Sequence, residues 1–165
     1  MLVFLRIDSA VSAARTHLEA AGAWGTEAEG FVTAHIVVMS VSEYEDRIER
    51  MVVRRAERAR DVELTNFVKK RVHQFFRSPD FAKVSEVLKS FSEATHTNFR
   101  ISVSEQDISA WGNLMTARHA LVHKRGAFQL TFREVESSLM ACSRIMDATA
   151  SALQLDAADL AVVMA

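Results

Sequence analysis

The sequence from residue 111 to residue 126 reads Trp111-Gly112-Asn113-Leu114-Met115-Thr116-Ala117-Arg118-His119-Ala120-Leu121-Val122-His123-Lys124-Arg125-Gly126. Together with Ile108, the apolar residues Trp111, Leu114 and Leu121 recur every three or four residues, which predicts one face of an α-helix. Arg118 occupies the remaining position of this row. Because an unpaired buried charge costs several kcal/mol, we expect Arg118 to meet a carboxylate, line a polar cavity or face an anionic ligand.

The boundaries of this helix are marked on both sides. Ser104-Glu105-Gln106-Asp107 is typical of a helix N-terminus, and Gly126 is expected just after the last helical residue. The cationic residues Lys124 and Arg125 suit a helix C-terminus. The helix is therefore predicted to end near His123, with His119 one turn earlier.

Composition predicts a single all-α domain. The chain has 165 residues, of which 49% are hydrophobic and 25% charged, and it contains only one Pro and five Gly. This length suits one domain with a sizeable core, and the scarcity of helix breakers favours an antiparallel bundle of about five or six helices. We expect one domain over residues 1–165, with a core from about 26 to 153. Residues 156–165 are expected to dock as a short helix or to cover a partner.

Several classes of protein are disfavoured. Cys142 is the single cysteine, so an internal disulfide framework and a cysteine-rich zinc site are both excluded, and the cytoplasm is the simplest location. No apolar run is long enough to cross a membrane or to act as a signal peptide. The net charge of −1 does not indicate a general nucleic-acid binder, so any RNA contact should be local. No metal motif is present, and no cofactor is expected.

The other helices are predicted from their caps and apolar spacing. They are expected at about Asp8–Ala23, from a capping box at Thr26–Glu29 onward, at about Asp61–Arg77, at about Pro79–Phe91 and from Thr131 onward, with a loop over 92–103. Asp8 or Ser9 should cap the first, and Ser78 with Pro79 at the first helical position should open the fourth. Each of four helices has a predicted apolar face. In the helix after Thr26 it consists of Val37, Val41, Tyr44, Ile48 and Met51, and in Asp61–Arg77 of Leu64, Phe67, Val68, Val72, Phe75 and Phe76. In Pro79–Phe91 it consists of Phe81, Val84, Val87, Leu88 and Phe91, and in the helix after Thr131 of Phe132, Val135, Leu139, Cys142, Ile145, Met146 and Leu153.

Two carboxylates could pair with Arg118. Glu45 lies on the flank of the second helix's apolar face, and Glu43 is two residues earlier. In one interpretation Glu45 is an ordinary solvated side chain. In the other, Glu45 or Glu43 pairs with Arg118 across the bundle and holds its guanidinium group, which could still present its outer nitrogens to phosphate.

Several cations could contact RNA. Arg47, Arg50, Arg54 and Arg58 fall in one row of the second helix and could follow a phosphate backbone, with Lys124 and Arg125 as further candidates. However, Glu43 and Arg47, like Asp46 and Arg50, have the i,i+4 spacing that stabilises an exposed helix face. We favour this second interpretation of the arginine row. His73 and His96 lack metal-ligand spacing and are expected to be surface or loop residues, and a metal shared by His119 and His123 lacks a third ligand.

The segment Arg118-His119-Ala120-Leu121-Val122-His123 resembles the HEPN superfamily, and most closely its ribonuclease-type (RiboL-PSP-HEPN) domains. A looser likeness is carried by Val41-Ser42-Glu43-Tyr44-Glu45-Asp46-Arg47-Ile48. As a layout of helices the resemblance covers about residues 26–153. It implies a helical bundle that forms a homodimer around its motif helices, so that two copies of Arg118 and His123 share one cleft. His119 stands where the family commonly has Asn or another polar residue, which leaves its role open: it could orient RNA or His123, or add a third titrating group.

The resemblance implies a metal-independent endoribonuclease that cleaves single-stranded or looped RNA by attack of the 2′-hydroxyl. Histidine can transfer protons near neutral pH and arginine can stabilise phosphate charge, so His123 is the expected base or acid and Arg118 the expected stabiliser. The resemblance also suggests a toxin or phage-defence effector controlled by an antitoxin or regulatory protein. Two alternatives remain: a non-catalytic module that binds a nucleotide or partner protein, and a plain helical scaffold that dimerises through its Phe-rich helices. In a purely structural interpretation of the motif, Arg118 is paired by Glu45, His123 caps helix carbonyls and His119 is an exposed neighbour.

Overall fold

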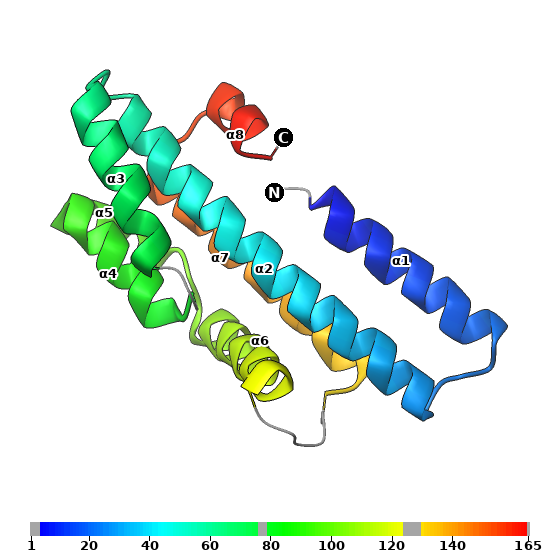
Figure 1. Ribbon diagram of the computed structural model, residues 1–165. Helices are drawn as coiled ribbons and strands as arrows, with labels where there is room; N and C mark the ends of the chain where they lie inside the picture. Colours follow the sequence, from blue (N-terminus) through cyan, green and yellow to red (C-terminus); the bar gives the residue numbers. More distant parts are fainter. Residues whose placement is uncertain (1–3, 76–78, 124–129, 165) are drawn as a thin grey trace.

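The computed structural model describes residues 4–75, 79–123 and 130–164, and within these ranges the regular structure is entirely α-helical (Figure 1). Eight helices follow one another along the described chain: α1 (Leu5–Ala20), α2 (Glu27–Glu57), α3 (Val62–Phe75), α4 (Phe81–Phe91), α5 (Glu93–Ile101), α6 (Glu105–His123), α7 (Phe132–Ala152) and α8 (Ala157–Met164). The predicted fold class is confirmed. The predicted number of about five or six helices is too low, because α5 lies in a segment that was predicted as a loop and α8 was only one of the two behaviours expected of residues 156–165.

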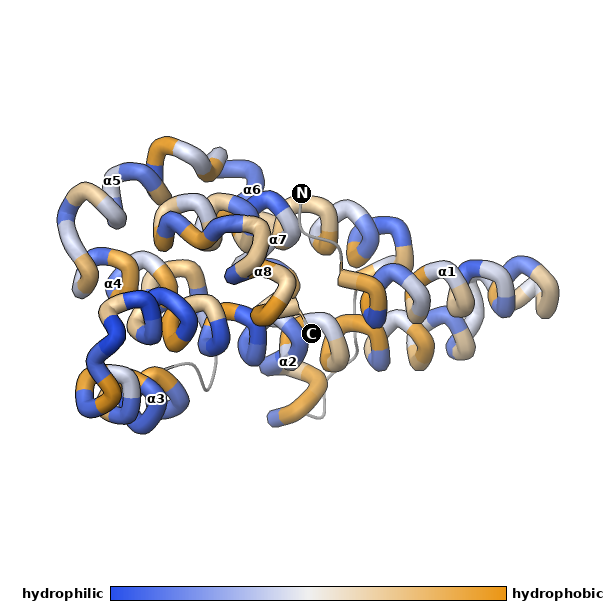
Figure 2. The backbone as a smooth tube through the Cα atoms, turned by 90° about the horizontal axis from the view of Figure 1, so that it is seen from above, coloured by the Kyte–Doolittle hydropathy of each residue, from blue (hydrophilic) through white to orange (hydrophobic). Residues whose placement is uncertain are grey.

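Helix α2 is the axis of the molecule. Its 31 residues correspond to a rod of about 46 Å at 1.5 Å per residue, and α1, α3, α6, α7 and α8 all pack against it. Its predicted apolar face is confirmed, since all five residues from Val37 to Met51 in that row are at most 1% exposed. Figures 1 and 2 agree that α1 lies towards one end of the molecule and α3, α4 and α5 towards the other.

Helix α7 runs beside α2 and completes the core. The capping box predicted at its start is present: the Thr131 hydroxyl accepts from the Glu134 amide, and the Glu134 carboxylate accepts from the Thr131 amide. Every residue predicted for its buried face, from Phe132 to Leu153, is at most 7% exposed. A reciprocal capping box and a long apolar stripe make this the element that the sequence predicts best.

Helix α6, which carries the Arg118 motif, is fixed at its start by polar contacts. The Asp107 amide donates to the Ser104 hydroxyl at 3.1 Å, and that hydroxyl donates to the Asp107 carboxylate at 2.7 Å, so the predicted N-terminus is confirmed. Further along, the buried Trp111 indole N–H donates to the Pro79 carbonyl at 2.8 Å. The first half of α6 is therefore held in a fixed position, and the motif extends from it.

The first two helices begin differently from the prediction. Helix α1 begins at Leu5 and places Asp8 inside its first turn, so neither Asp8 nor Ser9 is the cap. Helix α2 begins after Thr26 as predicted, but the Thr26 side chain does not cap it; the Thr26 hydroxyl donates back to the Ala23 carbonyl instead. The Glu29 carboxylate accepts from the amides of Gly25 and Phe132, so it ties the start of α2 to the start of α7.

The segment predicted as a loop over 92–103 contains helix α5. The Ser92 hydroxyl caps it by accepting from the Thr95 amide at 3.0 Å, and Phe99 is its one fully buried residue. One buried apolar residue in nine gives no periodic pattern, so the sequence analysis did not predict this helix. At the start of α4 the cap is Asp80, and Pro79 precedes it, so the prediction of Pro79 at the first helical position was wrong. The predicted cap Ser78 lies outside the described residues.

Helix α3 is less buried than its pattern predicts. Val72 is buried and Val68 half-buried, but Leu64 and Phe67 are 43% and 58% exposed, so the prediction for these two was wrong. Phe91 of α4, also predicted to be buried, is 39% exposed, and Phe81 is half-buried. Phe76 and the side chain of Phe75 lie outside the described part of the chain. The pattern found an apolar face, but neighbouring helices do not cover all of it.

The C-terminal segment docks on α2, which confirms one of its two predicted behaviours. Asp159 of α8 pairs with Arg54 of α2 at 2.8 Å and with Arg58 at 3.2 Å, while Arg47 donates to the Val163 carbonyl. Val163 is buried, and Val162 remains 57% exposed. Of the helices within the described ranges, none combines the length and the apolar character needed to cross a bilayer.

Candidate functional site

Arg118 lies in the last turns of α6, in the row of Trp111 and Leu114. Those two residues are fully buried, whereas Arg118 is half-buried. Its Nε is shielded from solvent and has no hydrogen-bond partner among the described residues. A buried N–H without an acceptor is rare because it loses its hydration without compensation. Arg118 therefore retains unused hydrogen-bonding capacity at a position that the apolar row fixes.

The charge of Arg118 acts on Glu45 of α2. Burial raises the pKa of the half-buried Glu45, and the positive charge of Arg118 opposes that rise. No ion pair within 4.0 Å joins Arg118 to a carboxylate of the described chain, so the two groups interact through their charges at longer range. Of the two predicted candidates, Glu45 is the one whose pKa is lowered by the charge of Arg118.

Glu43 has other partners. Its Oε1 accepts from Nε of Arg47 at 2.7 Å, and its Oε2 lies 3.8 Å from Nη1 of Arg6. Both contacts lie on the side of α2 that faces α1 and α8, and Glu43 is 9% exposed. Glu43 therefore belongs to the packing of the two chain ends against α2 and is not part of the Arg118 site.

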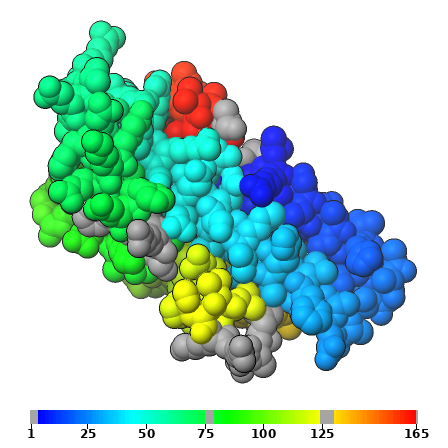
Figure 3. Space-filling view, in the orientation of Figure 1, coloured from blue at the N-terminus to red at the C-terminus, as the bar shows by residue number. Residues whose placement is uncertain are grey.

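His119 and His123 lie side by side at the exposed end of α6. Their ring centroids are 4.8 Å apart with an angle of 46° between the ring planes, and both side chains are exposed. Figure 3 shows this end of α6, in yellow, on the molecular surface. The i,i+4 spacing predicted their proximity. Both imidazoles are accessible to a ligand that approaches the end of the helix.

A second polar group lies near Glu45 and was not predicted. His73 of α3 contacts Glu49 of α2 through Nδ1 at 3.3 Å. Glu49 raises the pKa of Glu45, while His73 and Lys83 lower it, so these side chains lie within electrostatic reach of Glu45. Together with Arg118, they bring charged groups from α2, α3, α4 and α6 together. The i,i+4 spacing of Glu45 and Glu49 was visible in the sequence, but the approach of His73 depends on how α3 packs.

The arginine row of α2 is occupied by protein contacts. Arg50 pairs with Asp46 at 2.9 Å, and Arg54 pairs with Asp159 and with Glu57 at 3.2 Å. Arg47 and Arg58 bind Glu43 and Asp159 respectively, and both also donate to backbone carbonyls. These contacts favour the interpretation of the row as a stabilised helix face that anchors α8. The other two RNA-binding candidates, Lys124 and Arg125, lie outside the described residues, as does the predicted C′ residue Gly126.

Other reactive side chains do not add to this site. Cys142 is fully buried, and burial raises the pKa of its thiol far above the usual range, so it is not an available nucleophile. His96 contacts the Ser85 hydroxyl through Nε2 at 2.9 Å. Across residues 4–75, 79–123 and 130–164, no three His, Cys, Asp or Glu side chains are grouped as they would be to hold a metal ion. Histidine and arginine are therefore the reactive groups that α6 offers.

No model of a known protein family matches the chain, and no curated protein or solved structure matches it either. The likeness to HEPN domains therefore stays a prediction that depends on the Arg118 to His123 segment and on the helix layout.

Proposed function

We propose that this protein is a metal-independent endoribonuclease of the HEPN type, with Arg118 and His123 as its catalytic residues. The observation that supports this most directly is the composition of the end of α6. There a half-buried arginine with an unpartnered Nε is followed by two exposed, adjacent imidazoles. A guanidinium group suits a phosphate ligand, and imidazoles suit proton transfer.

The reaction follows from what RNA itself supplies. The ribose 2′-oxygen attacks the neighbouring phosphorus while the bond from phosphorus to the 5′-oxygen breaks, leaving a 2′,3′-cyclic phosphate and a 5′-hydroxyl. One group must take the proton of the 2′-hydroxyl, and another must protonate the departing 5′-oxygen. His123 is the proposed proton-transfer group. Arg118 is proposed to stabilise the charge that gathers on the phosphate oxygens.

The helical register favours a site shared by two chains. Five residues of α-helix turn through about 140° beyond a full circle, so Arg118 and His123 leave α6 in different directions. Arg118 interacts with Glu45 of α2, whereas His119 and His123 are exposed. If two copies meet at the ends of their α6 helices, each guanidinium can face the histidines of the other copy. Such a homodimer would supply a base and an acid from two copies of His123.

The substrate class and the biological role extend this proposal. Single-stranded or looped RNA is favoured because a duplex restrains the geometry of in-line attack. Control by an antitoxin or another regulatory protein, and a role as a toxin or phage-defence effector, rest on the likeness to HEPN domains alone.

The test is cleavage of an end-labelled, mixed-sequence RNA by the purified protein in EDTA. Arg118→Ala and His123→Ala are expected to remain folded and to abolish cleavage, and the parent is expected to produce cyclic-phosphate ends. His35→Ala is the matched control because His35 is an exposed histidine on α2 away from α6. Circular dichroism and thermal melting of each variant establish that loss of activity is not loss of fold.

Two results would count against the proposal. Cleavage that persists in both variants would show that another protein or another site is responsible. If the parent leaves every RNA tried intact but binds RNA or a nucleotide, and that binding is lost in Arg118→Ala, the non-catalytic binding module becomes the better description.

A further inference from the structure

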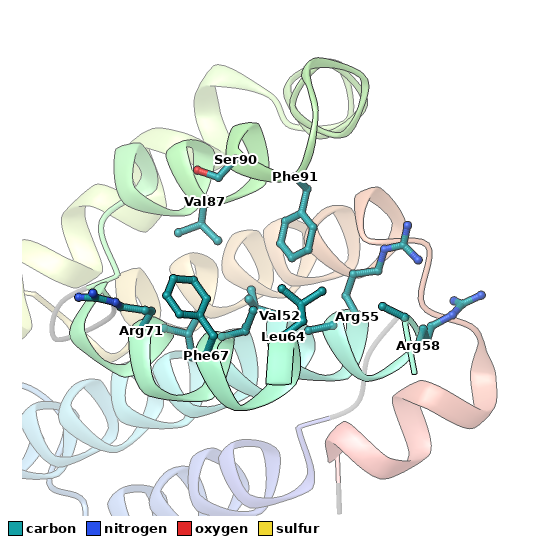
Figure 4. A pocket seen from close by; sticks show the side chains of 13 residues that line it. Val52, Arg55, Arg58, Leu64, Phe67, Arg71, Val87, Ser90 and Phe91 are labelled. Atoms are coloured by element: carbon teal, nitrogen blue, oxygen red, sulfur yellow. The ribbon is translucent and has the colours of Figure 1, made fainter. Parts of the chain in front are cut away.

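Helices α2, α3 and α4 enclose an apolar groove with a volume of about 610 Å³ (Figure 4). Val52 and Ala56 of α2 line it together with Leu64 and Phe67 of α3 and Phe91 of α4. This volume is within the range of sites that bind ligands. The groove lies where the predicted burial of α3 and α4 failed.

The exposure of its walls is unusual for side chains of this size. Leu64, Phe67 and Phe91 are 43%, 58% and 39% exposed, and all three line the same groove. Single exposed apolar residues are common, but several in one concave patch mark a site of interaction. Their burial by a ligand would recover hydrophobic free energy that the isolated chain does not gain.

The charged side chains that line the groove are positive. Among the described residues the lining includes Arg55, Arg58 and Arg71, and no Asp or Glu. Arg55 forms no hydrogen bond or ion pair within the described chain, and Arg71 lies 5.7 Å from the Phe67 ring centroid in a cation–π contact. Arg58 is already bound to Asp159. Arg55 and Arg71 are therefore the cations available to a ligand.

The arrangement of these cations limits the kind of ligand. Figure 4 shows Arg71 at one end of the apolar lining and Arg55 with Arg58 at the other, with Leu64 and Phe67 between them. An amphiphile with one anionic head, such as a fatty acid, would satisfy only one end. A ligand with an apolar stripe and acidic groups at both ends would satisfy the whole groove.

We propose that this groove binds an acidic amphipathic helix of a partner protein. Both walls are helix faces, since Leu64, Phe67 and Arg71 follow at helical spacing on α3, as do Val87 and Phe91 on α4. Such faces present ridges of side chains against which another helix can pack. A helix laid between such walls can insert apolar side chains at i, i+3 or i+4, and i+7. Its flanking carboxylates pair with Arg55 at one end and Arg71 at the other.

The groove is separate from the site at Arg118. Along α2, Glu45 precedes the groove residues Val52 to Ala56 by 7 to 11 positions, which correspond to about 10–17 Å of helix. No described residue of α6 lines the groove, so the two sites use different side chains. This proposal goes beyond the ribonuclease proposal and does not depend on it.

The test is selection of a displayed library of helix-forming peptides of about 20 residues, randomised on one face, against the full chain. The expected binders combine apolar residues at helical spacing with Asp or Glu on the flanks. Phe67→Glu should weaken their binding by at least about tenfold, because it places a carboxylate in the apolar lining. Phe31→Glu should leave binding unchanged, since Phe31 is 75% exposed on α2 and does not line the groove.

Charge reversal provides the second arm. The double variant Arg55→Glu with Arg71→Glu should lose the acidic peptides and select basic ones, whereas Arg133→Glu, an exposed residue on α7, should retain the acidic ones. Arg71→Glu alone serves if the double variant does not fold, because Arg71 is exposed.

Any of five results would overturn the proposal, and the first four concern peptides and the chain itself. These are no binders, binders that Phe67→Glu does not affect, binders that are basic or uncharged, and dimerisation of the chain itself that Phe67→Glu abolishes. Saturable binding of oleate that excludes the selected peptides and needs only one of the two arginines would assign the groove to an anionic amphiphile instead.

Discussion

Arg144 of α7 donates through both Nε and Nη2 to a single oxygen, Oδ1 of Asp107 in α6, with the Nε contact at 2.9 Å. The other oxygen of Asp107 accepts from Ser104 at the start of α6. Asp107 is 6% exposed, so one buried carboxylate caps the helix and fastens it to α7. The position of the Arg118 motif depends on this residue because the motif extends from the same helix.

Asp107→Asn is expected to lower the free energy of unfolding by about 1–3 kcal/mol at pH 7, because it removes the charged acceptor of Arg144. The hydrogen bonds from Arg144 and Ser104 hold the pKa of Asp107 below its usual range despite burial. A lowered pKa in the folded protein means that this stability is present above the unfolded-state pKa of about 3.9 and is lost as the pH falls through the folded-state pKa. Urea denaturation of parent and variant from pH 7 downward measures the difference, which should shrink below about pH 4.

The control for this experiment is Asp46→Asn. Asp46 pairs with Arg50 at 2.9 Å, but both side chains are nearly half exposed, so the expected loss is at most about 0.5 kcal/mol. Equal losses in the two variants would mean that the buried pair contributes no more than an exposed one.

Trp111→Phe is expected to destabilise the fold by about 2–4 kcal/mol, because it leaves the Pro79 carbonyl without its donor and creates a small cavity. Trp111 is fully buried, and its indole N–H makes the 2.8 Å contact to Pro79. Trp24→Phe is the matched control: Trp24 is 41% exposed, packs edge-on against Phe132, and should lose at most about 1 kcal/mol. Chemical denaturation followed by circular dichroism compares the two, and similar losses would contradict the anchoring role of Trp111.

The parts of the fold that could be predicted are those in which one helix carries its own signal. The apolar row from Val37 to Met51 and the capped stripe beginning at Thr131 each contain enough turns to fix a face. Helix α3 has an equally clear pattern, but Leu64 and Phe67 remain exposed. Periodicity identifies the apolar face of a helix, but it does not show whether a neighbouring helix packs against that face.

The same limit applies to the site. His119 and His123 are one turn apart in one helix, so the proximity of their rings was predictable. The choice between Glu43 and Glu45 was not, because it depends on how α2 is rotated against α6. The approach of His73 to Glu49 depends likewise on the packing of α3. Arg54 and Arg58 of the arginine row pair with Asp159 because α8, about a hundred residues later in the sequence, packs against α2. Spacing within α2 could not predict this contact.

Glu45→Gln is expected to separate stability from activity. Burial raises the pKa of Glu45 in spite of the opposing charges of Arg118, His73 and Lys83, so the ionised form is disfavoured in the folded state. For a carboxyl group with a raised folded-state pKa, the penalty is present at neutral pH and disappears as the pH falls through both pKa values. The variant should therefore be at least as stable as the parent at pH 7, and the difference should vanish below the unfolded-state pKa of about 4.3.

The ribonuclease activity of Glu45→Gln is expected to fall, although its stability does not. If Glu45 helps to position the Arg118 guanidinium electrostatically, Glu45→Gln should slow RNA cleavage without changing the cyclic-phosphate product. Glu86→Gln is the control, since Glu86 is an exposed carboxylate on α4. A variant that is destabilised at pH 7 would contradict the raised pKa, and one that cleaves RNA as fast as the parent would remove Glu45 from the proposed site.

Mixing parent and His123→Ala chains tests whether the catalytic site is shared between two copies. If a site needs His123 from both chains, only parent–parent dimers cleave RNA, and random assortment with an about threefold excess of variant leaves about one sixteenth of the dimers active. If each chain works alone, about one quarter of the parent activity remains at the same total protein. Co-refolding of the two chains before the assay ensures that they exchange partners.

The dependence on mixing ratio distinguishes these cases more sharply than the oligomeric state does, because a dimer can form without sharing its active site. Cleavage should fall with the square of the parent fraction when the site is shared, and linearly when it is not. The matched mixture with His35→Ala should keep full activity at every ratio, since His35 is an exposed histidine outside α6. A linear decline with His123→Ala would place base and acid within one chain, and His119, whose ring lies beside that of His123, would then be the first candidate for the second proton-transfer group.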